Sequence, residues 1–342
     1  MKRSLMFAGV AGLALLGACQ MLPADEPADA AAAEETIEEE VGVLVAEATR
    51  EADRTAEAEM SETAESSDEE MDTSAADALA TALDMQPDEV KARYEWRHPD
   101  ETLEFFEIEP GMTVIEALPG GGWYSKILIP YLGPEGTLIG AHYPDEIWML
   151  ILPNATEERV DGILKRLETW KETAQGWFGD AGASVFDYKM THVSPEKKEA
   201  ADAVLFIRAL HNLNRTEGEL RTLSQTIDET YRILKPGGIV GVVQHRASED
   251  TPDEWADGNA GYLKTSFVVD AFETAGFVLE ESSEINANPA DTADHPFGVW
   301  TLPPVSATSD REGNTPDGFD AEAYAAIGES DRMTLKFVKP AE

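Results

Sequence analysis

Two hydrophobic patterns alternate along residues 112–338. Short unbroken apolar runs are typical of strands buried in a parallel sheet, and apolar residues at every third or fourth position are typical of amphipathic helices. The runs predict strands around Val114 and Ile115 and at 136–142, 184–188, 203–207, 239–243, 277–281 and 333–338. Helical spacing lies between them, at 160–170, 220–234 and 267–275. The alternation predicts an α/β fold with a doubly wound, mostly parallel seven-stranded sheet.

The turn after the first predicted strand contains three consecutive glycines. Glu116 lies in that strand, Gly120, Gly121 and Gly122 form the turn, and Tyr124 begins the apolar part of the next helix. Glycine adopts positive φ without steric cost and lets a ligand approach the backbone closely. The same residues also suit a simple chain reversal, so the turn alone leaves ligand binding open.

Charge and cysteine content exclude several classes of function. The 342 residues include 26 Lys and Arg against 67 Asp and Glu, a formal net charge of −41. Such a surface repels phosphate backbones, so we expect no nucleic-acid partner. The single cysteine, Cys19, excludes an intramolecular disulfide and a cysteine metal cluster.

The amino terminus has the pattern of an export signal. Lys2 and Arg3 precede an uncharged stretch, 4–18, that is too short to span a membrane. It ends Leu-Gly-Ala-Cys, which resembles the lipobox of bacterial lipoproteins. That resemblance implies a signal peptide at 1–18 and a lipid on Cys19; an ordinary signal peptide is the alternative. Gln20 after the cysteine implies retention at the periplasmic face of the outer membrane, with the lipid as the only membrane contact.

The remaining chain divides into a tether and a folded domain. Residues 19–74 are acidic and nearly free of aromatic residues, so they predict a disordered tether. We expect the domain at 75–342, beginning with two short helices and containing an insertion loop at 303–328. Arg97 and His98 lie before the first strand; they either cover a ligand in the glycine turn or lie on the surface.

Several segments together resemble class I S-adenosylmethionine-dependent methyltransferases. Their order is right, and they cover most of 95–281; RHPDETLEFF, PGGGWYS and the His245-Arg246 pair further resemble exported bacterial proteins described only as predicted methyltransferases. The segments are VIEALPGGG (114–122), the stretch 202–213, ETYRILKPGGIVGVV (229–243) and VVDAFETAGFVLEE (268–281).

This resemblance implies S-adenosylmethionine as cofactor, with Glu116 near its methionyl amine. Two positions depart from the family pattern: Leu118 replaces the usual first glycine, and His142 replaces the acid that binds the ribose, a role open also to Asp145 or Glu146. The candidate cofactor-binding residues are Glu116, Gly120, Gly121, Gly122, Tyr124, His142 and Arg208.

Three histidines end predicted strands, where ligands of parallel sheets bind. Methyl transfer needs a positioned acceptor and a group that removes its proton, which histidine can do near neutral pH. We predict His211 and His245 as catalytic residues in one pocket with the glycine turn, and we favour His245 as the proton acceptor. A metal site that includes His142, or loop residues without a special role, remain alternatives, although no HExxH-type spacing favours metal.

Three functions remain open. The first is methyl transfer to a small molecule or an envelope component by an anchored lipoprotein. Because S-adenosylmethionine is made in the cytoplasm, an exported protein of this fold is alternatively a non-catalytic binder of a small ligand or an envelope partner. The third is a histidine-metal hydrolase. The sequence identifies no acceptor.

Overall fold

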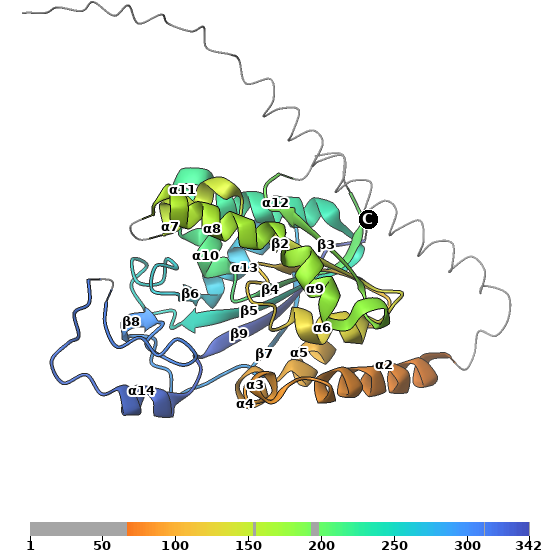
Figure 1. Cartoon of the computed structure of the whole chain (residues 1–342), viewed down its shortest axis with the longest axis horizontal. Helices are drawn as coiled ribbons and strands as arrows, with labels where there is room; N and C mark the ends of the chain where they lie inside the picture. Colours follow the sequence, from red (N-terminus) through yellow and green to blue (C-terminus); the bar gives the residue numbers. More distant parts are fainter. Residues whose placement is uncertain (1–66, 153–154, 193–197, 311, 342) are drawn as a thin grey trace, which may run out of the picture. The chain divides into compact units, whose positions relative to one another are not determined.

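The computed structural model describes residues 67–341 except 153–154, 193–197 and 311. The predicted signal peptide, Cys19 and most of the predicted tether lie outside the described residues. The described part has a central sheet with helices on both faces (Figure 1). No helix in it is both long enough and apolar enough to cross a membrane.

The sheet is mixed, and seven strands follow one another across it. In chain order these strands are β1 (Thr113–Ala117), β2 (Thr137–His142), β3 (Ser184–Lys189), β4 (Ala201–Ile207), β5 (Leu234–Ala247), β7 (Val278–Ser283) and β9 (Arg332–Val338). Across the sheet the order is β3-β2-β1-β4-β5-β9-β7, and β9 alone runs antiparallel to its neighbours. The predicted doubly wound, mostly parallel sheet is confirmed. Two further short strands are β6 (Leu263–Lys264), which pairs with β5, and β8 (Pro296–Val299).

Side-chain alternation explains why the sheet is covered on both faces. Successive residues of a strand point to opposite faces. In β1, Val114 joins one hydrophobic cluster and Ile115 the other, and in β4 Val204 and Leu205 divide in the same way. A strand buried on both faces is therefore mostly apolar, as these runs are, with Glu116 in β1 as a buried exception.

The longer helices supply the two outer layers. One cluster contains buried residues of α2 (Ser67–Asp84), α5 (Pro99–Phe105), α6 (Ser125–Leu132) and α9 (Trp170–Phe178). The other contains buried residues of α10 (Leu210–Asn214), α12 (Thr222–Ile233) and α13 (Thr265–Thr274). The remaining elements are α3 (Asp88–Lys91), α4 (Tyr94–Arg97), α7 (Trp148–Ile151), α8 (Glu157–Glu168), α11 (Glu217–Leu220), α14 (Ala321–Ile327) and the 3₁₀ turns η1 (Asp145–Ile147) and η2 (Gly179–Ala181).

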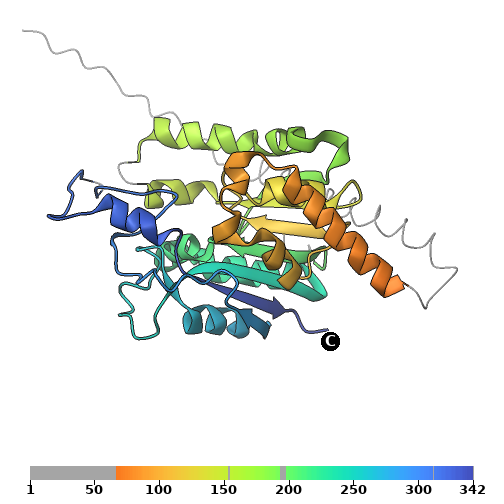
Figure 2. The ribbon, with the colours of Figure 1, turned by 90° about the horizontal axis from the view of Figure 1, so that it is seen from below.

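Two predicted helices differ from the observed ones. The sequence predicts a short first helix, but α2 has 18 residues and begins at Ser67. Figure 2 shows α2 as the long orange helix, whose Leu79 and Ala82 are buried in the cluster that includes α6. The single helix expected at 160–170 is divided into α8 and α9, which meet at Thr169.

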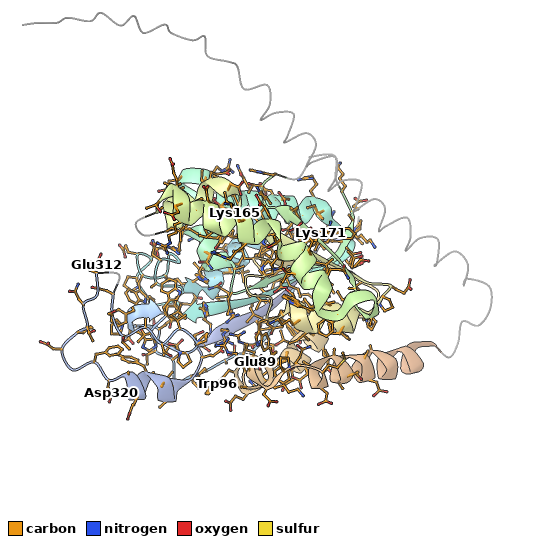
Figure 3. The ribbon with its side chains drawn as sticks, in the orientation of Figure 1. Glu89, Trp96, Lys165, Lys171, Glu312 and Asp320 are labelled. Atoms are coloured by element: carbon orange, nitrogen blue, oxygen red, sulfur yellow. The ribbon has the colours of Figure 1, made fainter. Side chains whose placement is uncertain are left out.

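The expected insertion at 303–328 is a loop that ends in α14. Figure 3 labels Glu312 and Asp320 in this segment, and Trp96 near its far end. The ring of Trp96 lies against Gly328, where an added Cβ would come within 2.2 Å of it. The contact fixes the end of the segment beside α4, directly before Glu329 and Ser330.

Candidate functional site

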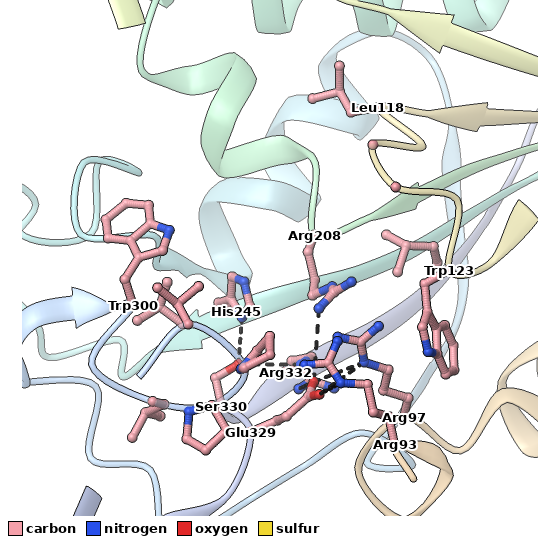
Figure 4. A pocket seen from close by; sticks show the side chains of 18 of the residues that line it. Arg93, Arg97, Leu118, Trp123, Arg208, His245, Trp300, Glu329, Ser330 and Arg332 are labelled. Atoms are coloured by element: carbon pink, nitrogen blue, oxygen red, sulfur yellow. Dashed lines mark hydrogen bonds and ion pairs between the residues drawn. The ribbon is translucent and has the colours of Figure 1, made fainter. Parts of the chain in front are cut away.

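A pocket of about 580 Å³ lies at the carboxyl ends of β1, β4 and β5 (Figure 4). It brings together five of the residues predicted from the sequence, which lie at the glycine turn and at the ends of β4 and β5. These are Gly120, Gly121, Arg208, His211 and His245. Four predicted residues do not line it: Glu116, Gly122, Tyr124 and His142.

The three glycines of the turn have different surroundings. An added Cβ at Gly121 would meet nothing within 4 Å, and Gly121 lines the pocket. A Cβ at Gly122 would lie 2.2 Å from the ring of Trp177, so that glycine serves close packing of α9. Leu118 has φ 55°, the left-handed conformation that glycine adopts more easily. The backbone at this position therefore has a conformation that favours glycine, although the sequence has leucine.

Glu116 and Tyr124 support the turn from inside. Glu116 is 4% exposed and accepts a hydrogen bond from the Ser125 hydroxyl. Burial raises the pKa of Glu116 to about 7, although the Ser125 hydrogen bond and Arg208 act in the opposite direction. The buried Tyr124 hydroxyl donates to the backbone carbonyl of Arg97 at 3.2 Å. These two side chains connect the turn to its neighbours.

His142 lies outside the pocket, packed edge-on against Trp170 with ring centroids 5.0 Å apart. Its Nε2 is 3.8 Å from the Asp187 carboxylate. Burial, with a smaller effect of Lys189, lowers the pKa of His142 to about 4, and burial raises the pKa of Asp187 to about 6. His142 is therefore uncharged at neutral pH, and the contact is not an ion pair. The alternative ribose ligand Asp145 is paired with Lys189 at 2.6 Å.

The other two histidines face each other, with ring centroids 5.2 Å apart. Gln244 fixes the tautomer of His211. The amide nitrogen of Gln244 donates to the carbonyls of His245 and Gly261, so the amide oxygen, Oε1, must face the ring of His211. This oxygen lies 3.2 Å from Nδ1 of His211 and can only accept a hydrogen bond, so Nδ1 carries the proton. Nε2 of His211 is therefore left without a proton.

His245 is held by Ser330. Its Nδ1 lies 2.5 Å from Oγ of Ser330, and the same oxygen accepts a hydrogen bond from Nε of Arg332. Because a hydroxyl oxygen has two lone pairs as well as one proton, Ser330 can either donate to Nδ1 of His245 or accept from it. The hydrogen bonds therefore give His211 a free acceptor at Nε2, and they do not fix which nitrogen of His245 carries the proton; the preference for His245 as proton acceptor stays a prediction.

Both imidazoles are neutral at pH 7. Burial is the main reason that the pKa of His211 falls to about 4, with Arg215 and Arg208 adding to it against the Gln244 hydrogen bond. Burial and the neighbouring His211 hold the pKa of His245 well below its usual value. Among the described residues, no three His, Cys, Asp or Glu side chains gather as metal ligands.

Four arginines surround one buried carboxylate at the pocket wall (Figure 4). Glu329 is 3% exposed and lies 3.0 Å from Arg97, 2.6 Å from Arg332, 3.4 Å from Arg93 and 3.9 Å from Arg208. Burial by itself would raise the pKa of Glu329, but Arg332 and Arg97 outweigh it, and the pKa is lowered. Glu329 is therefore ionised at neutral pH.

The topology explains how this cluster forms. Because β9 runs antiparallel, its first residue, Arg332, pairs with His245 near the carboxyl end of β5. Arg97 comes from α4, more than 200 residues away in the chain, and its guanidinium lies 4.5 Å from the centre of the Trp123 ring. Of the two interpretations of Arg97 and His98, Arg97 lines the pocket, whereas His98 does not.

Sequence reasoning missed Glu329, Ser330 and Arg332. The available signal was the charged run Glu-Ser-Asp-Arg directly before the apolar strand β9. Burying a charged side chain at the start of a strand costs free energy unless the charge is paired. The run therefore indicates that a partner of opposite charge lies nearby. The sequence does not reveal that this partner lies beside Arg97.

Comparison with known proteins gives likenesses of fold only. No family model matches the sequence, and no curated protein matches it. Among solved structures, the [4+2]-cyclase SpnF is 17% identical, with a TM-score of 0.41 over 72% of this chain and 81% of its own. A SAM-dependent methyltransferase from Aquifex aeolicus is 16% identical, with a TM-score of 0.38 over 61% of this chain and 93% of its own. An arsenic(III) S-adenosylmethionine methyltransferase from Chlamydomonas reinhardtii is 14% identical, with a TM-score of 0.39 over 77% of this chain and 73% of its own. All three TM-scores are below 0.5, so these likenesses carry no conclusion about the activity of this chain.

Proposed function

We propose that the protein is an S-adenosylmethionine-dependent methyltransferase with a small-molecule acceptor. The observation that carries this proposal is that one pocket joins the Gly120–Gly121 turn to the unprotonated Nε2 of His211. A turn open to a ligand and a neutral base are the two parts that methyl transfer to a protonated acceptor requires.

The residues present fit the cofactor at one end. S-Adenosylmethionine, when bound, supplies a methyl group on a sulfonium. Gly120 and Gly121 would hold its methionyl end, because an added Cβ would find open space at Gly121 and only a carbonyl oxygen at 3.8 Å at Gly120. The Glu116 carboxylate accepts a hydrogen bond from Ser125 and so stabilises the turn between β1 and α6. The fit does not extend to the predicted ribose position, since His142 is outside the pocket.

The chain's own residues then have separate roles. His211 would accept the acceptor's proton at Nε2, and Gln244 holds the ring in the tautomer that allows this. His245, whose ring faces that of His211 in the same pocket, would contact the bound acceptor. Trp300 and Leu302 line the pocket and would exclude water from the bound acceptor.

Calorimetry with S-adenosylmethionine and S-adenosylhomocysteine tests the proposal. We expect micromolar binding, about −8 kcal/mol. Gly121→Asp, which places a carboxylate in the pocket, should abolish this binding. Gly218→Asp is the matched control, because Gly218 on α11 also has open space around it but lies outside the pocket. If the folded protein gives no heat at millimolar ligand, or if both variants behave alike, the proposal is wrong.

A second candidate is a non-catalytic binding protein on the same fold. The specific observation in its favour is that Leu118 occupies a glycine conformation and that no residue at the end of β2 lines the pocket. In this case the cofactor titration fails, while another small molecule still binds at the pocket.

We further propose that the protein is an exported lipoprotein, anchored by Cys19 at the periplasmic face of the outer membrane. The support is the sequence of residues 1–20, and these residues are outside the described part of the chain. A lipid anchor would be its only membrane contact.

A further inference from the structure

The charge of the pocket is opposite to that of the protein. The chain has a formal net charge of −41. The pocket lining nevertheless has five cationic side chains, Arg93, Arg97, Lys126, Arg208 and Arg332, against the two carboxylates Glu89 and Glu329. Both histidines of the pocket are neutral, so they do not change this balance. A protein so poor in basic residues has concentrated them around one cavity.

Some donors of this cluster have no partner in the described residues. Nη1 of Arg97 is buried without a hydrogen bond, in a side chain that is only 2% exposed. The indole Nε1 of Trp123, beside it, is also buried and unpaired. The guanidinium of Arg208 makes no hydrogen bond within the described residues, and its ion pair with Glu329 is long, at 3.9 Å. A buried donor without a partner is costly, so Arg97 and Trp123 lack an acceptor. The Arg208 side chain is 25% exposed, so its donors are open to water and to a ligand.

Arg332 serves as a contrast, because its three nitrogens are all bonded. Nε donates to Ser330, Nη1 to the carbonyl of Trp96 at 2.8 Å and Nη2 to Glu329 at 2.6 Å. Arg332 is therefore a scaffold for the cluster. Arg97 and Arg208 retain donors that a ligand can take.

The cluster is also under mutual repulsion. Burial, followed by the charges of Arg97 and Arg332, lowers the pKa of Arg208 to about 9. Arg208 is still charged at neutral pH, so four guanidiniums share the single carboxylate of Glu329. A second anion in the pocket would relieve this repulsion and pair the free donors.

We propose that the pocket binds a small molecule through a phosphate or carboxylate group, held by Arg97 and Arg208 with Arg93 beside them. Guanidinium groups suit both oxyanions, because their planar N–H pairs match two oxygens at once. In Figure 4, Trp300 lies on the opposite side of His245 from Arg97 and Arg93. The apolar part of the ligand would lie there, against Trp300, Val299 and Leu302.

Binding of this anionic molecule does not depend on the proposed methyl transfer. The inference that the same molecule is the methyl acceptor rests on the proposed function. We assign Arg208 to this site and not to the cofactor, because it belongs to the Glu329 cluster. The oxyanion would anchor the acceptor and present the remainder of the molecule to His211, which lines the same pocket.

The test is titration of the full chain with inorganic phosphate and, separately, with citrate, in low-chloride buffer without S-adenosylmethionine. We expect saturable binding of at least one of the two anions. Calorimetry and the rise in melting temperature measure this binding. The phosphate and citrate titrations distinguish the two oxyanions. Absence of saturation by either at millimolar concentration would overturn the proposal.

Three variants locate the site. Arg208→Gln should weaken binding by about tenfold, and Arg208→Lys, which keeps the charge but loses the planar pair of donors, should fall between. Arg166→Gln on α8 removes the same charge from an exposed position and should bind as the unaltered protein does. Without anion, Arg208→Gln should melt no lower than the unaltered protein, because it loses only repulsion and a long ion pair. Equal binding by Arg208→Gln and Arg166→Gln would contradict the assignment.

The two proposals fail separately. Anion binding without binding of S-adenosylmethionine would keep the oxyanion site and remove methyl transfer. Binding of S-adenosylmethionine without any anion binding would keep the cofactor and remove this inference.

Discussion

Adjacent glycines in the turn after β1 perform different tasks. Gly121 borders open space in the pocket, whereas Gly122 has φ 73° and lies against Trp177. Their order in the sequence does not distinguish these tasks, because both are equally small. The difference appears only when a Cβ is placed at each position.

We therefore predict effects of different size for the same substitution at the two positions. Gly122→Ala should lower the free energy of unfolding by about 1–3 kcal/mol, because its Cβ would overlap the Trp177 ring. Gly121→Ala should change it by less than about 0.5 kcal/mol. Denaturant unfolding of the two variants measures this. Equal destabilisation would show that the turn, and not the contact with Trp177, sets the cost.

The second prediction concerns His142 and the dependence of stability on pH. Its folded pKa of about 4 is below the unfolded value of 6.5, so the unfolded state binds the proton first and stability falls as pH falls through this interval. Between about pH 7 and pH 5, the unaltered protein should lose about 2 kcal/mol more than His142→Gln does. Asp187, whose pKa is raised to about 6, acts in the opposite direction but is present in both proteins. Parallel pH profiles would mean that His142 is not neutral in the fold.

At the scale of elements, α2 is the largest departure from the expected fold. Its polar sequence predicts little beyond a short helix, yet Leu79 is 2% exposed and packs in the cluster beneath α6. This contact stabilises the helix, since isolated helices of this size are marginal in water.

Truncating Leu79 measures the contribution of α2. Leu79→Ala should cost about 2–5 kcal/mol, the usual range for a buried leucine. Met85→Ala, directly after the helix, is the control, because Met85 is 57% exposed. Similar melting of both variants would mean that α2 is not part of the cooperative unit.

For the whole molecule, the acidic amino-terminal segment is predicted to be separate from folding. A chain that begins at Ser67 should melt cooperatively and at the same temperature as the full protein, because the segment before it is acidic and nearly free of aromatic residues. A chain that begins at Asp88 lacks α2 and should melt lower. Differential scanning calorimetry compares the three. Loss of cooperativity in the Ser67 chain would contradict the predicted tether.

Anchoring also belongs to this scale. The proposed lipid on Cys19 predicts that the native protein fractionates with membranes and that its first peptide begins at Cys19 with added acyl mass. Cys19→Ser should release it to the soluble fraction. An unmodified peptide that extends upstream of Cys19 would reject the lipoprotein assignment.

The sequence by itself determined the sheet, the positions of its strands and the turn at Gly120 and Gly121. Each follows from local rules: a strand buried on both faces is mostly apolar, and a tight turn needs glycine. Because these rules act within a few residues, the strand edge that holds His211 and His245 was also predictable.

Only the tertiary structure decided which charges meet. Arg97, Arg208 and Glu329 come from three distant segments, and they converge because β9 enters the sheet antiparallel and begins at the edge where β5 ends. The same packing excluded His142 from the pocket, and it placed His211 against Gln244 and His245 against Ser330. Local patterns encode burial, whereas the partners of a buried polar group depend on register between segments far apart in the chain.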